Sequence, residues 1–113
     1  MTGTTTLELP RHAGCAGIAR LIVSAHANAL TEERQKNARL LVSELVTNAF
    51  RHGRGRIRLT VHSDDAGIRA QVDDDGTIGG IESGGYGLRF VERLSDSWGV
   101  GPGGARVWFT LAS

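Results

Sequence analysis

Apolar and polar residues alternate along this chain with two different periods, which predict strands and helices. Alternation at every second residue predicts a half-buried strand, whereas apolar residues three or four positions apart predict an amphipathic helix. Strands are predicted over residues 4–9, 56–63, 68–73, 98–100 and 105–111, and helices over residues 13–30, 31–51 and 88–94. A turn at residues 64–67 joins the second and third strands, so part of the sheet is expected to be antiparallel with one polar face.

The second predicted helix has recognisable ends. Thr31 is a favourable N-cap residue, and the two glutamates that follow it place negative charge at the positive end of the helix dipole. Gly53 follows the last turn and is predicted to adopt the left-handed conformation that commonly ends a helix. The helix is therefore expected to run to about Arg51.

This helix carries polar side chains within an apolar pattern. Glu44 and Asn48 are four residues apart and share one face, and Arg51 and His52 follow one turn later. The side-chain oxygen of Asn48 suits one ligand position of Mg²⁺, Glu44 suits a general base, and Arg51 could neutralise phosphate charge. Helix position alone equally allows Asn48 to hydrogen-bond within the fold while Glu44 and Arg51 face solvent.

A second candidate site precedes the last predicted helix. Three consecutive aspartates are followed by a glycine-rich segment, and Gly85-Tyr86-Gly87 leads into the helix. Backbone N–H groups of a glycine turn and a helix N-terminus attract anions, so phosphate is an expected ligand. Asp74 is the candidate acceptor for the exocyclic amine of adenine, with Asp73 and Asp75 expected to be exposed; a solvated acidic turn is the alternative. The Walker A and dinucleotide-binding glycine motifs are absent from the sequence.

Composition narrows the choice of ligands and compartment. The 13 basic and 12 acidic residues give a formal net charge of +1, which does not favour nucleic acid or an anionic membrane as the ligand. Cys15 is the only cysteine, so we expect no disulfide framework and a reducing, cytoplasmic environment. No apolar span approaches membrane thickness. At 113 residues the chain is expected to form a single domain, with His12 and His26 at its surface.

Taken together, three motifs resemble the nucleotide-binding boxes of the GHKL (histidine kinase-like) ATPase superfamily. These motifs are Glu44-x3-Asn48-Ala49-x-Arg51-His52, Asp74-x-Gly76 and Gly85-x-Gly87-Leu88, in that order. Within the superfamily the chain looks like the anti-sigma factor serine/threonine kinases of bacteria. The resemblance extends from Leu9-Pro10 to Val107-Trp108-Phe109.

The resemblance implies an α+β fold, namely a two-layer sandwich of the Bergerat type with a mostly antiparallel mixed sheet and about three helices on one face. It implies that ATP and Mg²⁺ bind through Asn48, Asp74, Gly76 and two glycines of the last motif, with Asn48 as the Mg²⁺ ligand. Arg51 and Leu88 are included in the expected ATP site. Glu44 would be the general base.

The same resemblance implies the partners. Family members bind a sigma factor and phosphorylate a serine or threonine of an anti-sigma antagonist, and the first strand and helix are candidates for a homodimer or partner contact. Two positions depart from the family pattern, because Ile78 replaces a glycine and Ala105 replaces a threonine that helps to fix the adenine-binding carboxylate. The alternative function is therefore a non-catalytic sigma- or antagonist-binding module with a weak or vestigial nucleotide pocket.

Overall fold

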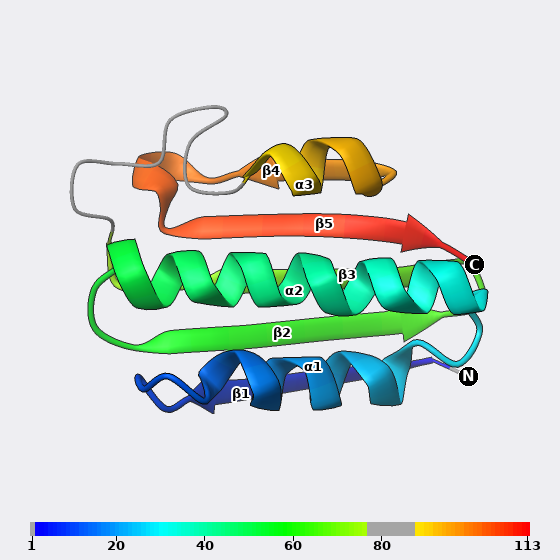
Figure 1. The fold of residues 1–113 in the computed structure, drawn as a ribbon, viewed down its shortest axis with the longest axis horizontal. Coiled ribbons are helices and arrows are strands. Elements are labelled where there is room, and N and C mark those ends of the chain that lie inside the picture. Colours follow the sequence, from blue (N-terminus) through cyan, green and yellow to red (C-terminus); the bar gives the residue numbers. More distant parts are fainter. Residues whose placement is uncertain (1, 77–87) are drawn as a thin grey trace.

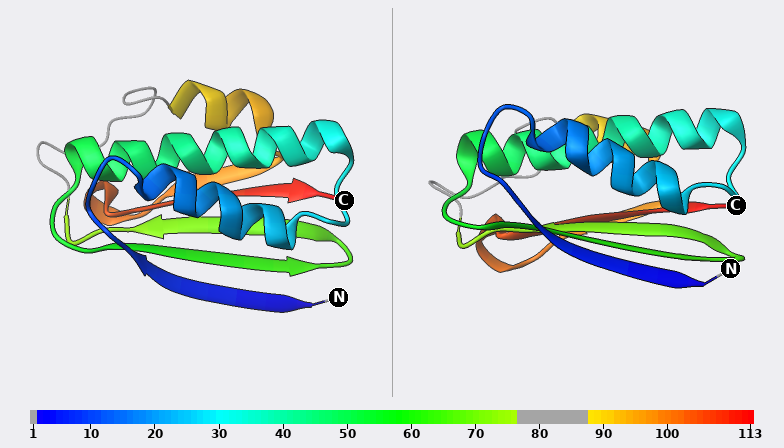
Figure 2. Two further views of the ribbon diagram at one scale, coloured as in Figure 1. Left: turned by 60° about the horizontal axis from the view of Figure 1, so that its bottom comes forward. Right: turned by 90° about the horizontal axis from the view of Figure 1, so that it is seen from below.

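The computed structural model describes residues 2–76 and 88–113 of the chain. These residues form two layers, with three α-helices packed on one face of a five-stranded sheet (Figures 1 and 2). The elements in chain order are β1 (Gly3–Leu9), α1 (Cys15–His26), α2 (Glu32–His52), β2 (Ile57–Asp64), β3 (Gly67–Asp73), α3 (Leu88–Leu94), β4 (Ser97–Val100), a short 3₁₀ turn (Pro102–Gly104) and β5 (Arg106–Ala112). The predicted α+β two-layer fold is confirmed.

The sheet has the strand order β1-β2-β3-β5-β4, and all four pairings are antiparallel. The predicted hairpin is present, since Asp64 pairs with Gly67 at the turn between β2 and β3. Residues of β2 alternate as predicted, with Ile57, Leu59 and Val61 fully buried beneath the helices. The sheet therefore turns one apolar face to the helices, and no helix of residues 2–76 and 88–113 covers the other face (Figure 2).

Helix α2 lies along the middle of the sheet and supplies much of the core (Figure 1). Its N-terminus is capped as predicted, because the backbone N–H of Arg34 donates to Thr31 Oγ1 at 3.2 Å. Its buried face comprises Ala38, Leu41, Val42, Leu45, Val46, Asn48 and Ala49. Within the described part of the chain, Asn48 is the one polar side chain of the buried set.

Two predictions about α1 were wrong. The helix ends at His26, not near Leu30, because the chain turns there and the backbone N–H of Ala27 donates to Ser24 O at 3.3 Å. His26 is half-buried, not a surface residue, since its ring pairs with Thr5 Oγ1 at 2.8 Å and Ser63 Oγ at 2.7 Å. Burial, followed by the nearby His62, lowers the pKa of His26. The ring thus ties α1 to β1 and β2.

The uncovered sheet face carries an ordered polar row. Arg69 donates to Gln71, Gln71 donates to Asp73, and Arg106 Nε lies 2.7 Å from Asp73 Oδ1. The predicted exposure of Asp73 was therefore wrong, because this ion pair holds its side chain at 18% exposure. The guanidinium of Arg69 also lies over the Trp108 ring, 4.9 Å from its centroid.

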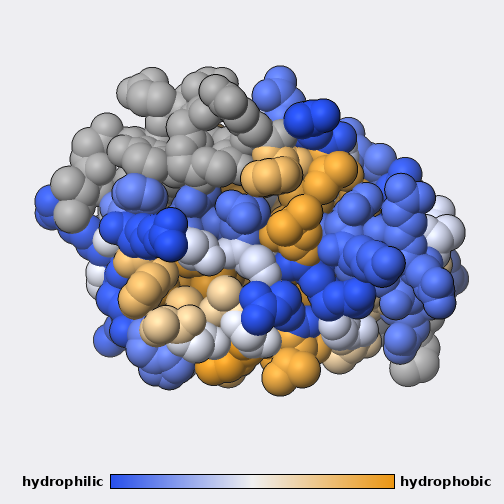
Figure 3. Space-filling view, viewed as in Figure 1, coloured by the Kyte–Doolittle hydropathy of each residue, from blue (hydrophilic) through white to orange (hydrophobic). Residues whose placement is uncertain are grey.

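The helical face of the molecule carries some apolar side chains in contact with solvent. Leu21 of α1, Leu40 of α2 and Phe90 of α3 are 73%, 40% and 46% exposed. Figure 3 shows apolar side chains gathered on this face, over α3 and over α1. No helix of residues 2–76 and 88–113 combines the length and the apolar character needed to cross a membrane.

Candidate functional site

The C-terminal half of α2 and the end of β3 meet at one end of the molecule and enclose a narrow pocket. Asn48 from α2 and Asp74 from the residue after β3 both line it, although 26 positions separate them in the sequence. The rest of the lining is apolar or glycine: Leu45, Ala49, Val72, Gly104 and Val107. The structure therefore brings together the two residues predicted to bind Mg²⁺ and adenine.

Asn48 has no hydrogen-bonding partner for its amide nitrogen within the described residues. The residue is 7% exposed, and its Nδ2 atom is fully buried. A buried polar group left without a partner costs about 1–3 kcal/mol of stability, so such groups are uncommon away from functional sites. The alternative role for Asn48 was a hydrogen bond within the fold. Among the described residues, its Nδ2 atom has no such bond.

This arrangement is compatible with a bound Mg²⁺ that is held mainly by phosphate and water. The described residues contain no cluster of three His, Cys, Asp or Glu side chains that could bind a metal without help from a ligand. Mg²⁺ commonly takes one or two protein oxygens together with substrate phosphates and water. The Asn48 carboxamide fits that pattern, because its Oδ1 is a neutral oxygen ligand, while its buried Nδ2, a donor without a partner in the described residues, suits a phosphate oxygen.

Asp74 is held at the pocket by its backbone and its side chain. Its N–H donates to Ala105 O at 2.8 Å, and its Oδ1 accepts from the Gly76 N–H at 2.7 Å. Burial is the largest influence on its carboxyl and raises the pKa, against the opposing effects of the Gly76 N–H and the positive charge of Arg11. The carboxylate is therefore partly desolvated and available to a hydrogen-bond donor in the pocket.

Asp74 should give the free protein a pH-dependent stability of known sign. Because the pKa of Asp74 is raised in the folded state, the protonated carboxyl stabilises the fold. This stabilisation is fully present below the ordinary pKa of 3.8 and is lost as the pH rises through the raised pKa. Asp74→Asn stays uncharged, so its unfolding free energy relative to the wild type should increase over that pH rise. Urea denaturation of both proteins at several pH values measures this difference, and a pH-independent difference would contradict the assignment.

The predicted left-handed conformation of Gly53 was wrong. Its φ and ψ are −84° and −177°, which is extended backbone. Glycine is needed here for a different reason, because a Cβ atom would lie 2.4 Å from Asp74 Oδ2 and 2.7 Å from Ala49 O. Gly55, two residues later, takes the positive φ of 66°. Gly53 thus lets the carboxylate of Asp74 pack against the end of α2.

The other predicted site residues are placed less centrally. Gly76 has a φ of 139°, and no atom of the described residues lies within 4 Å of the position of a Cβ atom, so those residues leave its backbone open to a ligand. Glu44 is half-buried one turn before Asn48, and Arg51 is exposed in the last turn of α2; neither lines the pocket. Gly85 and Gly87 lie outside the described residues, as does Ile78.

Leu88 is the first residue of α3, as predicted, but its side chain is not among the described parts of the structure. The sequence motifs also missed two contributors to the site. Gly104 lines the pocket, is buried and has a φ of 73°; the glycines at 103 and 104 indicated only a turn. Arg11 contacts the end of α2, and no local pattern could have indicated a contact 38 positions away.

Comparisons with known proteins place the chain in a family. Residues 10–111 match the model of the histidine kinase-like ATPase domain. A solved structure described as the RsbU and RsbW domains of Rv1364c from Mycobacterium tuberculosis has the same fold, with a TM-score of 0.72 at 20% identity. The match covers 96% of this chain and 31% of that one, so this chain spans about a third of its length. The search among curated proteins found no match. Because the family model covers nearly the whole sequence, the chain belongs to the histidine kinase-like ATPase domain family.

Proposed function

We propose that this chain is an ATP- and Mg²⁺-binding anti-sigma regulatory protein that phosphorylates a serine or threonine of an antagonist protein. The observation that carries the proposal is the pairing, in one pocket, of the unpartnered Asn48 amide with the partly desolvated Asp74 carboxylate. Membership of an ATPase domain family supports ATP as the ligand. The fold shared with a structure that contains an RsbW domain supports the regulatory class.

Each residue has a defined role in the proposed complex. Asp74 would accept a hydrogen bond from the exocyclic amine of adenine, while Leu45 and Val72 would pack against the base. Asn48 would hold Mg²⁺ through its side-chain oxygen, and the ion would supply charge neutralisation at the phosphates. Arg51, which is exposed on the last turn of α2, would add a positive charge on the phosphate side.

Glu44 would act on the phosphate acceptor. In the proposed step it takes the proton from the partner's hydroxyl, whose oxygen forms a bond to the γ-phosphorus of ATP. The bond between that phosphorus and the β–γ bridging oxygen breaks, and ADP leaves. The partners would be a sigma factor and its antagonist in the cytoplasm, with residues 1–113 acting as a single domain.

Calorimetry followed by a transfer assay tests this function. Titration of the protein with ATP in the presence of Mg²⁺ should give a binding isotherm, and the absence of heat and of a thermal shift at millimolar ATP would exclude an ATP-dependent kinase. Labelled ATP should then transfer its phosphate to the cognate antagonist. Binding without transfer would instead favour the non-catalytic module, which the alanine at position 105 also favours.

Ala105→Thr should tighten ATP binding. The backbone of residue 105 pairs with that of Asp74, since Ala105 O accepts from the Asp74 N–H, and we expect a threonine hydroxyl at this position to support the carboxylate. One hydrogen bond to a charged group is worth about 1.5–3 kcal/mol, which corresponds to roughly tenfold to hundredfold in affinity. Calorimetry measures the change. Ala105→Val is the matched control, since it has the same shape without the hydroxyl, and equal affinities for the two variants would refute the role of the hydroxyl.

A further inference from the structure

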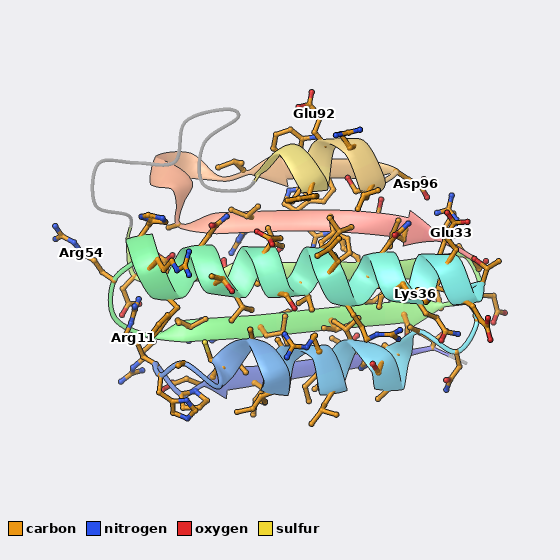
Figure 4. The ribbon with its side chains drawn as sticks, viewed as in Figure 1. Arg11, Glu33, Lys36, Arg54, Glu92 and Asp96 are labelled. Carbon is orange, nitrogen blue, oxygen red and sulfur yellow. The ribbon has the colours of Figure 1, made fainter. Side chains whose placement is uncertain are left out.

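Arg11 makes an unusual set of contacts for an exposed residue. It lies between β1 and α1, and its guanidinium donates to three backbone carbonyl oxygens: Phe50 O at 2.7 Å, Gly55 O at 2.9 Å and Ala49 O at 3.0 Å. Figure 4 shows Arg11 at the end of the molecule where α2 terminates and Arg54 at the same end, pointing outward. A side chain from the first connection thus holds the end of α2.

These contacts address a general need of helix termini. The last four carbonyl groups of a helix have no donor within the helix, and the C-terminus carries a partial negative charge. Arg11 supplies charged donors to two carbonyl groups of the last turn, that of Phe50 and that of Ala49, which also accepts from the Gly53 N–H, and its third donor reaches Gly55 in the following loop. One guanidinium therefore joins the helix end and the loop after it.

The loop fixed in this way is the surface against which Asp74 packs. Gly53 lies between the residues that Arg11 binds, and its N–H donates to Ala49 O at 3.0 Å. The close approach of Asp74 Oδ2 to Gly53 leaves no room for a side chain there. The next aspartate is also tied to this loop, because its Oδ2 accepts from the Arg56 N–H at 2.9 Å and its own N–H donates to Arg54 O at 2.9 Å.

We propose that Arg11 is a positioning residue for adenine recognition, which sets the loop of residues 53–55 so that Asp74 faces the base. This inference rests on the proposed nucleotide-binding function. Among the described residues, Arg11 and Asp75 are the charged side chains that act on Asp74, and the positive charge of Arg11 opposes the effect of burial on its pKa. Arg11 thus both places the carboxylate and favours its charged, hydrogen-bond-accepting form.

Base selectivity distinguishes positioning from a general effect on the fold. Adenine presents an amine where guanine presents a carbonyl oxygen, so a carboxylate fixed at that point favours adenine and disfavours guanine. When Asp74 occupies its place for only a fraction of the time, the apparent affinity for ADP falls by that fraction. The affinity for GDP, which gains nothing from Asp74, should not fall in the same proportion.

The test compares Arg11→Met, Arg11→Lys and Arg58→Met in the full chain. Arg11→Met keeps much of the apolar length of the side chain but removes the charge and the donors, whereas Arg11→Lys keeps the charge without the planar set of donors. Arg58→Met is the matched control, because it removes the same charge from an exposed side chain of β2, outside this loop. Calorimetry with ADP and with GDP, each with Mg²⁺, gives the ADP-to-GDP affinity ratio. The amide resonance of Gly76, whose N–H donates to Asp74, reports the carboxylate position in the free protein.

We expect Arg11→Met to weaken ADP binding about tenfold, to lower the ADP-to-GDP ratio and to move the Gly76 amide resonance. Arg11→Lys should restore part of the ratio, and Arg58→Met should leave both the ratio and the resonance at wild-type values. An unchanged ratio and resonance in Arg11→Met, or the same changes in Arg58→Met, would overturn the inference. If the wild type binds neither nucleotide, the proposed function fails, while the Gly76 resonance still tests whether Arg11 positions Asp74.

Discussion

Asn48→Leu should make the nucleotide-free protein more stable and should remove most of its ATP binding. Leucine has the same branched shape as asparagine but carries no polar atom, so it removes the buried amide that lacks a partner in the described structure. Replacing such a group by an apolar one should raise the unfolding free energy by about 1 kcal/mol, or the melting temperature by about 4–8 °C. The loss of the proposed Mg²⁺ ligand should lower ATP affinity by roughly tenfold to hundredfold.

Thermal denaturation without nucleotide and calorimetry with ATP and Mg²⁺ measure the two effects. Asn37→Leu is the matched control, because Asn37 is a half-buried asparagine on the same helix and does not line the pocket. It should change ATP affinity little. An Asn48→Leu protein with a lower melting temperature and normal ATP binding would show that Asn48 serves the fold and not the ligand.

The expected opposition between stability and binding would explain the placement of a polar residue in α2. The neighbours of Asn48 on the buried face are apolar, and a helix in a two-layer fold needs that face for the core. Asn48 interrupts the apolar pattern where α2 passes the end of β3, the point at which Asp74 leaves the sheet. Violations of local rules concentrate at functional sites because selection there acts on the ligand as well as on the fold.

The elements of the fold could be predicted from the sequence because their signals are local. Alternation in β2 and β3 and the cap at Thr31 depend on residues next to one another, and the structure contains both strands and the cap. The end of α1 and the burial of His26 could not be predicted. The burial of His26 depends on Thr5 and Ser63, which lie 21 and 37 positions away and meet the ring only after the sheet has formed.

The candidate site likewise has features that could be predicted from the sequence and features that could not. The resemblance of the motifs selected Asn48 and Asp74, and the structure places both in one pocket. The sequence could not show why Gly53 is glycine, because its neighbour is the Asp74 carboxylate and not a residue of its own turn. The contacts of Arg11 are of the same kind, since they join the β1–α1 connection to the end of α2. Long-range contacts of this sort leave no periodic signal in the chain.

Glu44→Gln should abolish most phosphate transfer while ATP still binds. Glutamine has nearly the same size as glutamate but cannot accept the proton of the partner's hydroxyl, and a general base contributes on the order of a hundredfold to ten-thousandfold in rate. Binding should survive because Glu44 is only half-buried, lies outside the lining of the pocket and is separated from Asn48 by one helical turn. A transfer assay with labelled ATP and the cognate antagonist, together with calorimetry, separates the two effects.

Glu33→Gln is the matched control, because it removes the same charge from an exposed position in the first turn of the same helix (Figure 4). It should leave transfer unchanged, so a loss confined to Glu44→Gln would assign the base to that position. Transfer that persists in Glu44→Gln at the wild-type rate would remove Glu44 from catalysis. In that case Asp74 and Asn48 would still define the nucleotide pocket, since their placement by β3 and α2 does not depend on Glu44.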